Sequence, residues 1–349
     1  MKRRQFINTT GAGMAGILAA GVAPAFAQGG PEIKWRLASS FAKSLDTIYG
    51  AAEYMSKRIA AATNNKFQIQ LFASGEIVPG LQALDAVQNG TVQVGHTAPY
   101  YYWGKDPAFA LDTAIPFGLN ARQMNAWQIF GLPAGNTGSQ MGGWYRKEIN
   151  TPDDLKGLKM RIGGFAGAVI AKLGAVPQQI AGGDIYPALE KGTLDACEWV
   201  GPYDDEKLGF YKVARNYYYP GWWEGSAMLH VFTGLEKWNS LPKTYQAIVR
   251  AAANRTNEYM MARYDIYNPA ALKRLVAAGT QLRPFPESVL DACFKASNEV
   301  YADINAKNED FKKVYEAMKA LRADQYLWFQ LSENTFDTYM MIQQRKKTL

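Results

Sequence analysis

One structural unit occurs twice in this sequence, with its copies about a hundred residues apart. Each copy reads as a helix, a Gly-Thr pair, a short strand of alternating polarity and a Pro-Tyr pair. The first copy covers residues 81–100 and the second covers residues 185–203. Strands and helices also alternate along most of the chain, which is the α/β pattern. The repeat therefore predicts two similarly built lobes rather than one sheet; chance similarity of two such units is the alternative.

Two lobes also suit a chain of 349 residues, because single hydrophobic cores stop growing at about 250–300 residues. We expect residues 28–150 and part of 240–300 in one lobe, and residues 151–239 and part of the C-terminal region in the other. In open α/β sheets, ligands bind beyond the carboxyl ends of the strands. The loops that follow the two repeated strands should therefore face each other across a ligand cleft.

The remaining elements follow from apolar periodicity and from Gly and Pro positions. A long helix is expected over 245–275, either continuous or interrupted near Asn268-Pro269. The other predicted strands are 33–38, 67–72, 91–96, 158–162, 193–198 and 280–283, and the other predicted helices are 47–62, 81–89, 165–173, 185–191, 288–319 and 323–344.

The last predicted helix carries more apolar surface than a terminal helix leaves in water. Its large apolar residues are Tyr326, Leu327, Trp328, Phe329, Leu331, Phe336, Tyr339, Met340 and Met341. This helix must therefore pack on something. The body of the same chain is the default partner, and a second subunit is the alternative.

The first 27 residues are typical of an export signal. Adjacent arginines, a weakly apolar stretch and the small-x-small site Ala25-Phe26-Ala27 resemble a twin-arginine signal, which predicts a periplasmic protein. Its removal lowers the formal charge from +7 to +4, because it carries Lys2, Arg3 and Arg4 and no acid. That charge is too mild to indicate a nucleic-acid surface. Cys197 and Cys293 lie among apolar residues, which favours buried free thiols over a disulfide.

Arg161 ends a short apolar strand that turns through Gly163-Gly164 into a helix. A helix that starts in this way has free backbone N–H groups at its N-terminus, which suit an anion. A guanidinium at the same place adds a planar pair of donors that matches a carboxylate. The plain alternative is a surface arginine at a strand end.

Three further segments accompany Arg161. Gln140 lies in a Gly-rich stretch, and the two acids Glu198 and Glu224 stand beside Trp199 and Trp223. Acids in apolar surroundings are costly to bury unless they are paired or bind a metal. Two such acids and a carboxylate ligand against one arginine leave two negative charges uncompensated. The sequence therefore predicts a bound cation, and carboxylate and amide oxygens favour a hard ion such as Ca²⁺ or Na⁺.

In this order, the segments resemble the DctP-type substrate-binding proteins of tripartite ATP-independent periplasmic (TRAP) transporters. The likeness covers nearly the whole chain after the signal. Its most specific stretch is Asp154-Leu155-Lys156-Gly157…Met160-Arg161. The resemblance implies a two-lobe periplasmic solute-binding protein whose Arg161 grips the substrate carboxylate. It also implies partner permease subunits in the membrane.

Within that family, the pattern resembles the branch that binds 2-oxo or 2-hydroxy monocarboxylates together with a metal ion. The resemblance implies that Gln140, Glu198 and Glu224 ligate the ion through their side chains and Trp199 through its carbonyl. It implies that Tyr100 and the indoles of Trp199 and Trp223 shape a small pocket. Members of this branch also form dimers by exchanging a C-terminal helix. Charge counting favours Ca²⁺, whereas the likeness to oxo-acid binders favours Na⁺.

Other functions fit the residues less well. The two histidines, His96 and His230, lie in strand-like apolar segments where structural roles are expected, and no hydrolase motif occurs. A periplasmic hydrolase is therefore the weakest alternative. A C4-dicarboxylate would need a second convergent cation, which the predicted cleft loops lack. A sensor protein of the same fold stays open, because the sequence does not separate sensing from transport.

Overall fold

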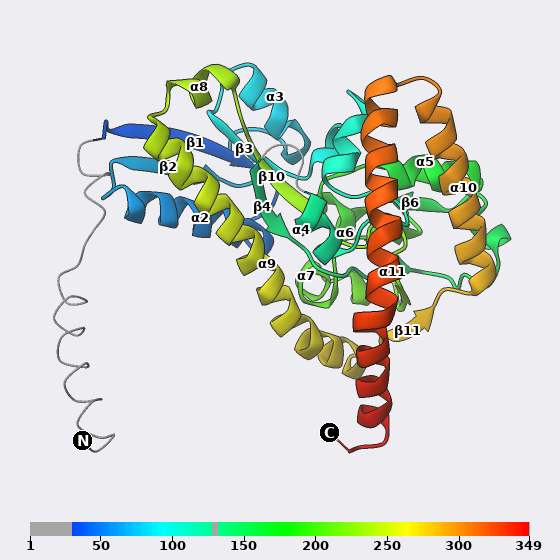
Figure 1. Ribbon diagram of the computed structural model, residues 1–349. Coiled ribbons are helices and arrows are strands. Elements are labelled where there is room, and N and C mark those ends of the chain that lie inside the picture. Colours follow the sequence, from blue (N-terminus) through cyan, green and yellow to red (C-terminus); the bar gives the residue numbers. More distant parts are fainter. Residues whose placement is uncertain (1–29, 128–131, 349) are drawn as a thin grey trace, which may run out of the picture.

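The computed structural model describes residues 30–127 and 132–348, so the expected signal at 1–27 lies outside the described residues. Two separate sheets, each covered by helices, form two lobes (Figure 1). The predicted two-lobe α/β fold is confirmed. Among the described helices, none combines the length and the apolar character needed to cross a membrane.

The first lobe is built on a five-stranded sheet of order β2-β1-β3-β10-β4. Strand β1 runs parallel to β2 and β3, and β10 runs antiparallel to β3 and β4. Its elements are β1 (Ile33–Ser39), α2 (Ile48–Ala62), β2 (Phe67–Phe72), η2 (Gly80–Gln82), α3 (Ala83–Gln88), β3 (Val94–Thr97), η3 (Pro99–Tyr102), η4 (Pro107–Asp112), α4 (Ala121–Trp127), β4 (Leu132–Asn136), β10 (Met228–Thr233) and α8 (Leu235–Ser240).

The second lobe is built on a six-stranded sheet of order β11-β9-β5-β8-β6-β7. Strand β6 is parallel to both β7 and β8, so the carboxyl ends of these three strands lie at one edge. Its elements are β5 (Gly143–Tyr145), η5 (Pro152–Leu155), β6 (Lys159–Arg161), α5 (Gly164–Lys172), β7 (Val176–Gln178), α6 (Gly182–Glu190), β8 (Ala196–Cys197), α7 (Pro202–Leu208), η6 (Phe210–Lys212), β9 (Asn216–Tyr219) and β11 (Gln281–Pro284).

The two repeated units lie in different sheets, β3 in the first and β8 in the second. Both strands are shorter than the predicted 91–96 and 193–198. The residues that precede each strand close the helix before it instead of joining the ladder. Val92 N–H donates to Ala86 O at 3.1 Å, and Leu194 N–H donates to Ala188 O at 3.2 Å. Equivalent bonds at equivalent places explain the shared sequence pattern and the shortened strands.

The chain crosses between the sheets at residues 137–142 and 220–227. Consequently β5 belongs to the second sheet and β10 to the first, which differs from the expected limits at 150 and 239. The two crossings run side by side. Thr137 N–H donates to Ala227 O at 3.0 Å, and Gly221 N–H donates to Gln140 O at 3.2 Å.

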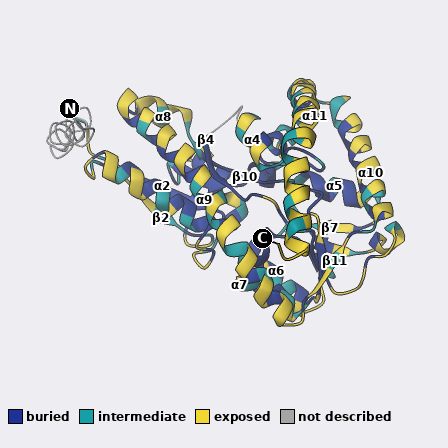
Figure 2. Ribbon diagram, turned by 60° about the horizontal axis from the view of Figure 1, so that its bottom comes forward, coloured by how far each residue is buried: buried dark blue, intermediate teal, exposed yellow. Residues whose placement is uncertain are grey.

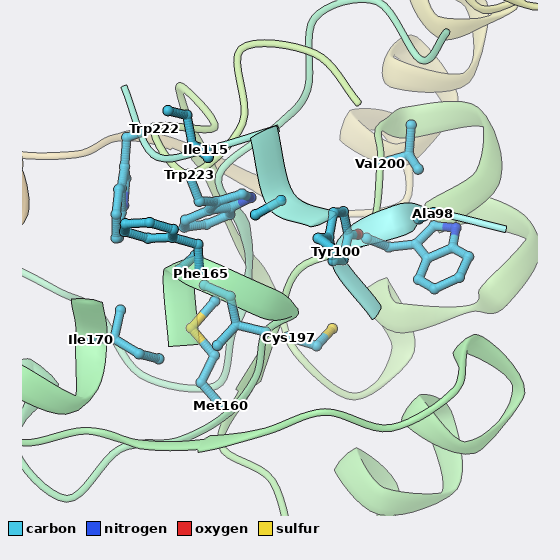
Figure 3. Close-up of a cluster of buried hydrophobic side chains, with 14 of the residues drawn as sticks. Ala98, Tyr100, Ile115, Met160, Phe165, Ile170, Cys197, Val200, Trp222 and Trp223 are labelled. Atoms are coloured by element: carbon cyan, nitrogen blue, oxygen red, sulfur yellow. The ribbon is translucent and has the colours of Figure 1, made fainter. Parts of the chain in front are cut away.

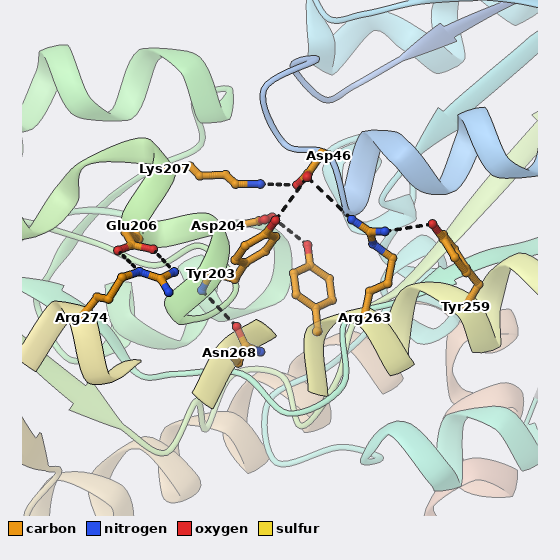
Figure 4. Close-up of polar contacts among 10 residues, drawn as sticks. Asp46, Tyr203, Asp204, Glu206, Lys207, Tyr259, Arg263, Asn268 and Arg274 are labelled. Atoms are coloured by element: carbon orange, nitrogen blue, oxygen red, sulfur yellow. Dashed lines mark hydrogen bonds and ion pairs between the residues drawn. The ribbon is translucent and has the colours of Figure 1, made fainter. Parts of the chain in front are cut away.

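Helix α9 (Lys243–Ala277) is the third connection between the lobes, and it is continuous through Pro269. It packs against β4 and α2 of the first lobe and against α7 of the second. Polar contacts hold its second half to α7: the Tyr264 hydroxyl donates to Asp204 at 2.6 Å, and Asn268 accepts from Tyr203 N–H at 3.0 Å (Figure 4). These contacts hold a helix in which proline has removed one backbone hydrogen bond.

The last two helices are α10 (Glu287–Asn305) and α11 (Glu309–Arg345). The predicted break at 320–322 is wrong, because the chain turns at 306–308 instead. Asn308 caps the new helix by accepting from Phe311 N–H at 2.9 Å. The second half of α11 projects beyond the body in Figure 1.

The C-terminal half of α11 is largely exposed in this single chain (Figure 2). Leu331 is 68% exposed and Trp328 is 60% exposed. By contrast, Phe311, Tyr315 and Met318 in the first half are buried. The apolar face predicted for residues 323–344 therefore exists, but the described part of the same chain does not cover it.

Candidate functional site

The carboxyl ends of β6, β7 and β8 bring the predicted arginine and one predicted acid together. Arg161 pairs in register with Gln178 and Cys197, so Glu198 follows at the same edge. Arg161 is fully buried, and Glu198 is 1% exposed. The surface-arginine alternative is therefore wrong.

Two of the three donor nitrogens of Arg161 are fixed by its own lobe. Its Nη1 donates to the Glu198 carbonyl at 2.9 Å and to the Glu198 carboxylate, and its Nε donates to Ile180 O at 3.2 Å. Its Nη2 is buried and has no hydrogen-bond partner among the described residues. A buried donor without a partner is costly. The two N–H groups of Arg161 Nη2 are therefore available to donate to a ligand.

The pKa values of the paired groups follow from burial and from each other. Burial disfavours the charged guanidinium, but the Glu198 carboxylate, together with Tyr101, Tyr100 and Cys197, outweighs this and raises the pKa of Arg161. Burial raises the pKa of Glu198, which Arg161 and the Gly163 N–H partly oppose. The pair is thus an internal ion pair, and Glu198 Oε2 has no partner among the described residues.

A second group of atoms lies on the two crossings. In the orientation given by the structure, Gln140 Oε1 lies 3.1 Å from Trp199 O and 3.2 Å from Glu224 Oε1, and Nε2 lies 3.0 Å from Thr137 Oγ1. Gln140 Oε1 therefore faces two other acceptor oxygens, and no hydrogen bond joins it to either of them. If the amide is turned by 180°, its nitrogen donates to Glu224 and to the Trp199 carbonyl instead. The turned orientation gives both amide atoms of Gln140 hydrogen-bond partners without an ion, whereas the first one suits a cation.

The donor set fits a hard cation. One carboxylate, one amide oxygen and one carbonyl are the ligands that Ca²⁺ prefers, at roughly 2.3–2.6 Å. Two oxygens at right angles about such an ion lie about 3.3 Å or more apart, close to the separations here. Burial, and then the Glu198 charge, raise the pKa of Glu224 well above its ordinary value. An added positive charge would relieve that cost.

Aromatic residues from both lobes belong to one buried cluster in this region, and Figure 3 shows Tyr100, Phe165, Trp222 and Trp223 among them. Two small cavities, each of about 10 Å³, lie between the lobes, and Tyr100 lines both. One includes Gln140 and Trp199 in its wall, and the other includes Glu198, Trp223 and Glu224. The predicted facing of the two repeated loops is confirmed, because Tyr100 and Trp199 line one cavity from opposite lobes.

The structure thus brings together the predicted residues Tyr100, Gln140, Arg161, Glu198, Trp199, Trp223 and Glu224. The expected ligands fall into two groups, since Glu198 contacts Arg161, whereas Trp199 O and Glu224 Oε1 both lie beside the Gln140 amide. Sequence reasoning missed Tyr101, whose pKa is raised by burial to about 12 and whose hydroxyl faces Arg161. It also missed Thr137. The Tyr100-Tyr101-Tyr102 run was the available signal for Tyr101.

Both histidines are structural, as expected. Burial lowers the pKa of His96 to about 3 and that of His230 to about 4. His96 lies 3.0 Å from Ser39 Oγ, and His230 lies 2.9 Å from Asp112 O. Cys197 and Cys293 are buried free thiols, as the sequence favoured.

A buried acid supports the Glu198-Trp199 segment from behind. Asp205 accepts from Trp144 Nε1 at 2.9 Å, from the Tyr217 hydroxyl at 2.7 Å and from Val200 N–H at 3.3 Å. Burial raises its pKa to about 7, despite these three donors. The folded state therefore holds the Asp205 proton more tightly than the unfolded state does, and stability from this group is lost as the pH rises.

We expect Asp205→Asn to have a lower Tm than the wild type at pH 5, and we expect this difference in Tm to shrink as the pH rises to 8. The amide keeps the shape of the protonated acid but carries no charge that must be buried at high pH. Thermal unfolding of both proteins across this range measures the difference in Tm. Parallel Tm curves would contradict a raised pKa for Asp205.

The sequence matches the pattern of the bacterial extracellular solute-binding proteins of family 7 (DctP) over residues 38–136 and 128–308. A monocarboxylate 2-oxoacid-binding periplasmic protein of Nostoc is 46% identical, over 97% of this chain and 99% of that protein.

Solved structures agree with the fold. A TRAP transporter solute-binding protein of Bordetella bronchiseptica, a dimer with copurified calcium and picolinate, has a TM-score of 0.89 and 48% identity, over 91% of this chain and 99% of that one. A TRAP periplasmic solute-binding protein of Pseudoalteromonas atlantica, with sodium and pyruvate, has a TM-score of 0.84 and 35% identity, over 87% and 98%. These similar structures hold calcium or sodium together with a carboxylate ligand.

Proposed function

Because this chain belongs to the bacterial extracellular solute-binding proteins of family 7, we propose that it captures a small 2-oxo or 2-hydroxy monocarboxylate together with Na⁺ or Ca²⁺. It would deliver this acid to the membrane permease subunits of a TRAP transporter. Its role is binding without catalysis. The residues before position 28 would act as a twin-arginine export signal, which places the protein in the periplasm.

One observation carries the proposal. The Gln140 amide oxygen lies 3.1 Å from Trp199 O and 3.2 Å from Glu224 Oε1, beside a buried arginine whose Nη2 has no partner among the described residues. The oxygens would hold the cation, and Arg161 Nη2 would donate to the ligand carboxylate. Glu198 was expected as a further ligand of the cation. Its Oε1 pairs with Arg161, so it would contribute only Oε2.

The cation would supply positive charge to the acid and to Glu224. The Arg161–Glu198 pair is neutral as a whole, so Glu224 and the ligand carboxylate leave two negative charges in a buried site. A divalent ion would cancel both, and Na⁺ would cancel one. Tyr100, Trp199 and Trp223 would exclude water and limit the size of the acid, which strengthens each electrostatic contact.

The walls of the two cavities favour a monocarboxylate over a C4-dicarboxylate. Among the described residues that line them, the charged ones are Glu198 and Glu224. A second carboxylate would therefore meet acids and aromatic rings instead of a positive partner. The acid's substituent would lie against the apolar wall of Ala114, Pro116, Ile162 and Phe165.

Thermal unfolding of the ligand-stripped mature protein tests this function. The ligands would be 2-oxo acids, 2-hydroxy acids and C4-dicarboxylates, each with Na⁺, with Ca²⁺ or with a chelator. We expect Tm to rise with one class of monocarboxylate and only when a cation is present. No rise with any monocarboxylate, or a rise that survives chelation and sodium removal, would contradict the proposal.

A homodimer is the second part of the proposal, with the apolar half of α11 packed on a second copy. Large exposed apolar patches on soluble proteins usually mark an interface. A groove of about 430 Å³ beside this helix, lined by Phe117, Trp222, Phe294 and Tyr326 among others, offers an apolar surface for a partner helix. The similar Bordetella structure is also a dimer.

We expect Leu331→Glu to convert the dimer to a monomer, because a charge would be buried in the interface. Light scattering on the purified protein would show the mass of one chain of 38.7 kDa, less any signal removed, instead of two. Gln330→Glu adds the same charge at the neighbouring exposed position and serves as the control. A wild type that is already monomeric would contradict the exchange of α11.

A further inference from the structure

Thr137 influences how the Gln140 amide is turned. Its hydroxyl is buried at the start of the first crossing and makes three contacts. Its Oγ1 accepts from Ala227 N–H at 2.9 Å, donates to Gly138 O at 3.0 Å and lies 3.0 Å from Gln140 Nε2. A hydroxyl has one hydrogen and two lone pairs. With its hydrogen on Gly138 O and one lone pair on Ala227, it can only accept from Gln140.

The Thr137 hydroxyl makes a different number of hydrogen bonds in each of the two amide orientations. When the amide nitrogen faces Thr137, all three hydroxyl contacts are hydrogen bonds. When the amide oxygen faces Thr137, the hydroxyl must turn its hydrogen to Gln140 and give up Gly138 O. The hydroxyl therefore favours the orientation in which Gln140 Oε1 faces Glu224 and the Trp199 carbonyl. A buried hydrogen bond contributes about 0.5–1.5 kcal/mol net. The hydroxyl therefore offsets part of the advantage that the turned amide gains from its two hydrogen bonds to Glu224 and the Trp199 carbonyl.

We propose that Thr137 is a positioning residue that lowers the free-energy cost of presenting the Gln140 amide oxygen to the cation. This inference rests on the proposed function, since it assumes that Gln140, Glu224 and Trp199 hold the ion. Thr137 itself does not ligate the ion. It accepts a hydrogen bond from Gln140 Nε2 when the amide oxygen faces the ion. Less free energy is then spent on turning the amide when the ion binds.

The alternative role for Thr137 is purely structural, because its bond to Ala227 ties the two crossings together. Ser226 provides a matched control for that role. It is fully buried next to Ala227 and donates to Asn136 Oδ1 at 2.7 Å, with no hydrogen bond to Gln140. Ser226→Ala removes a buried hydroxyl from the second crossing, beside Ala227, without touching the Gln140 amide.

The test is calorimetric titration of the ligand-stripped full-length mature protein with Ca²⁺ alone, and with Na⁺ alone if Ca²⁺ gives no heat. We expect Thr137→Val to weaken cation affinity by roughly 10- to 100-fold, the usual cost of losing a residue that orients a metal ligand. Thr137→Ser restores the hydroxyl and should stay within about threefold of the wild type. Ser226→Ala should lower Tm but leave cation affinity within the same range.

A measurement on the wild type does not depend on any variant folding. In the cation-bound protein, the side-chain amide protons of Gln140 should show nuclear Overhauser contacts to the Thr137 methyl group. If those protons instead face Glu224, the inference is wrong. A double-variant cycle adds a third readout, because Thr137→Val should cause no further loss of affinity once Gln140→Ala has removed the amide.

The outcomes separate this inference from the function on which it rests. If the wild type binds neither cation, alone or with any acid, the proposed function fails. If the wild type binds the cation and Thr137→Val binds it equally well, only the role of Thr137 fails. Equal losses of affinity in Thr137→Val and Ser226→Ala would assign Thr137 a structural role and overturn the inference.

Discussion

Arg161→Ala should abolish measurable binding of the acid. The substitution removes the buried Nη2 that is free to meet the ligand carboxylate, and it leaves the Glu198 carboxylate buried without its partner. A ligand carboxylate would then enter a site with two uncompensated acids. Breaking a buried ion pair from one side also costs about 3–5 kcal/mol of stability. We therefore expect Tm to fall together with affinity, as measured by thermal unfolding and calorimetry.

Two companion variants distinguish lost binding from lost folding. The double variant Arg161→Ala/Glu198→Gln carries no orphaned charge, so it should recover much of the lost Tm while binding stays absent. Arg283 belongs to the same lobe and pairs with Glu148 at 2.5 Å, but both side chains are at least one-third exposed. Arg283→Ala should change neither property strongly. Binding by Arg161→Ala within tenfold of the wild type would rule out its proposed role.

Glu224→Gln should weaken cation binding about 100-fold and abolish most of the cation dependence of acid binding, because ligand charge sets the affinity of such sites. The amide keeps the size of the side chain but removes the negative charge that the ion would offset. Calorimetry with Na⁺ and Ca²⁺, with and without the acid, measures both effects. Glu76→Gln removes an exposed acid that pairs with Lys43 at 2.6 Å and serves as the control.

The pH dependence gives the same prediction a second readout. Because burial and the Glu198 charge raise the pKa of Glu224, a proton competes with the cation over a pH range where an ordinary glutamate is already ionised. In the wild type, cation affinity should therefore rise as the pH rises through the raised pKa. Glu224→Gln should lack that rise. An unchanged response of this variant to chelation and pH would remove Glu224 from the proposed ligand set.

The sequence predicted those parts of the fold that depend on local patterns. The repeated unit led to two sheets, and the apolar periodicity of 245–275 led to one long helix. The break between the last helices was misplaced because residues 319–322 contain no helix-breaking residue, whereas the real break depends on the Asn308 cap. The strand lengths were overestimated because helix-closing bonds to Ala86 and Ala188 claim the residues that precede β3 and β8.

The candidate site was predictable as a set of residues but not as a set of contacts. Charge counting identified Arg161, Glu198 and Glu224 correctly as buried groups. It could not show that Glu198 pairs with Arg161, since this depends on the register of β6 and β8, whose residues are 37 positions apart at this contact. No sequence pattern marks Thr137. Its proposed role depends on one lone pair of its hydroxyl being free to accept from Gln140, which only the folded structure shows.

The two crossings carry Gln140 and Glu224, so two of the three residues proposed to hold the cation belong to the connections between the lobes, and the third, Trp199, belongs to the second lobe. An open molecule would separate Trp199 from these residues or strain the paired crossings. Binding of the cation and closure of the two lobes are then coupled in one equilibrium. The observed association constant would be the association constant of the closed molecule multiplied by the fraction of molecules that are already closed. Substitutions remote from the acid that change only this fraction would alter affinity for every ligand by the same factor and leave selectivity untouched.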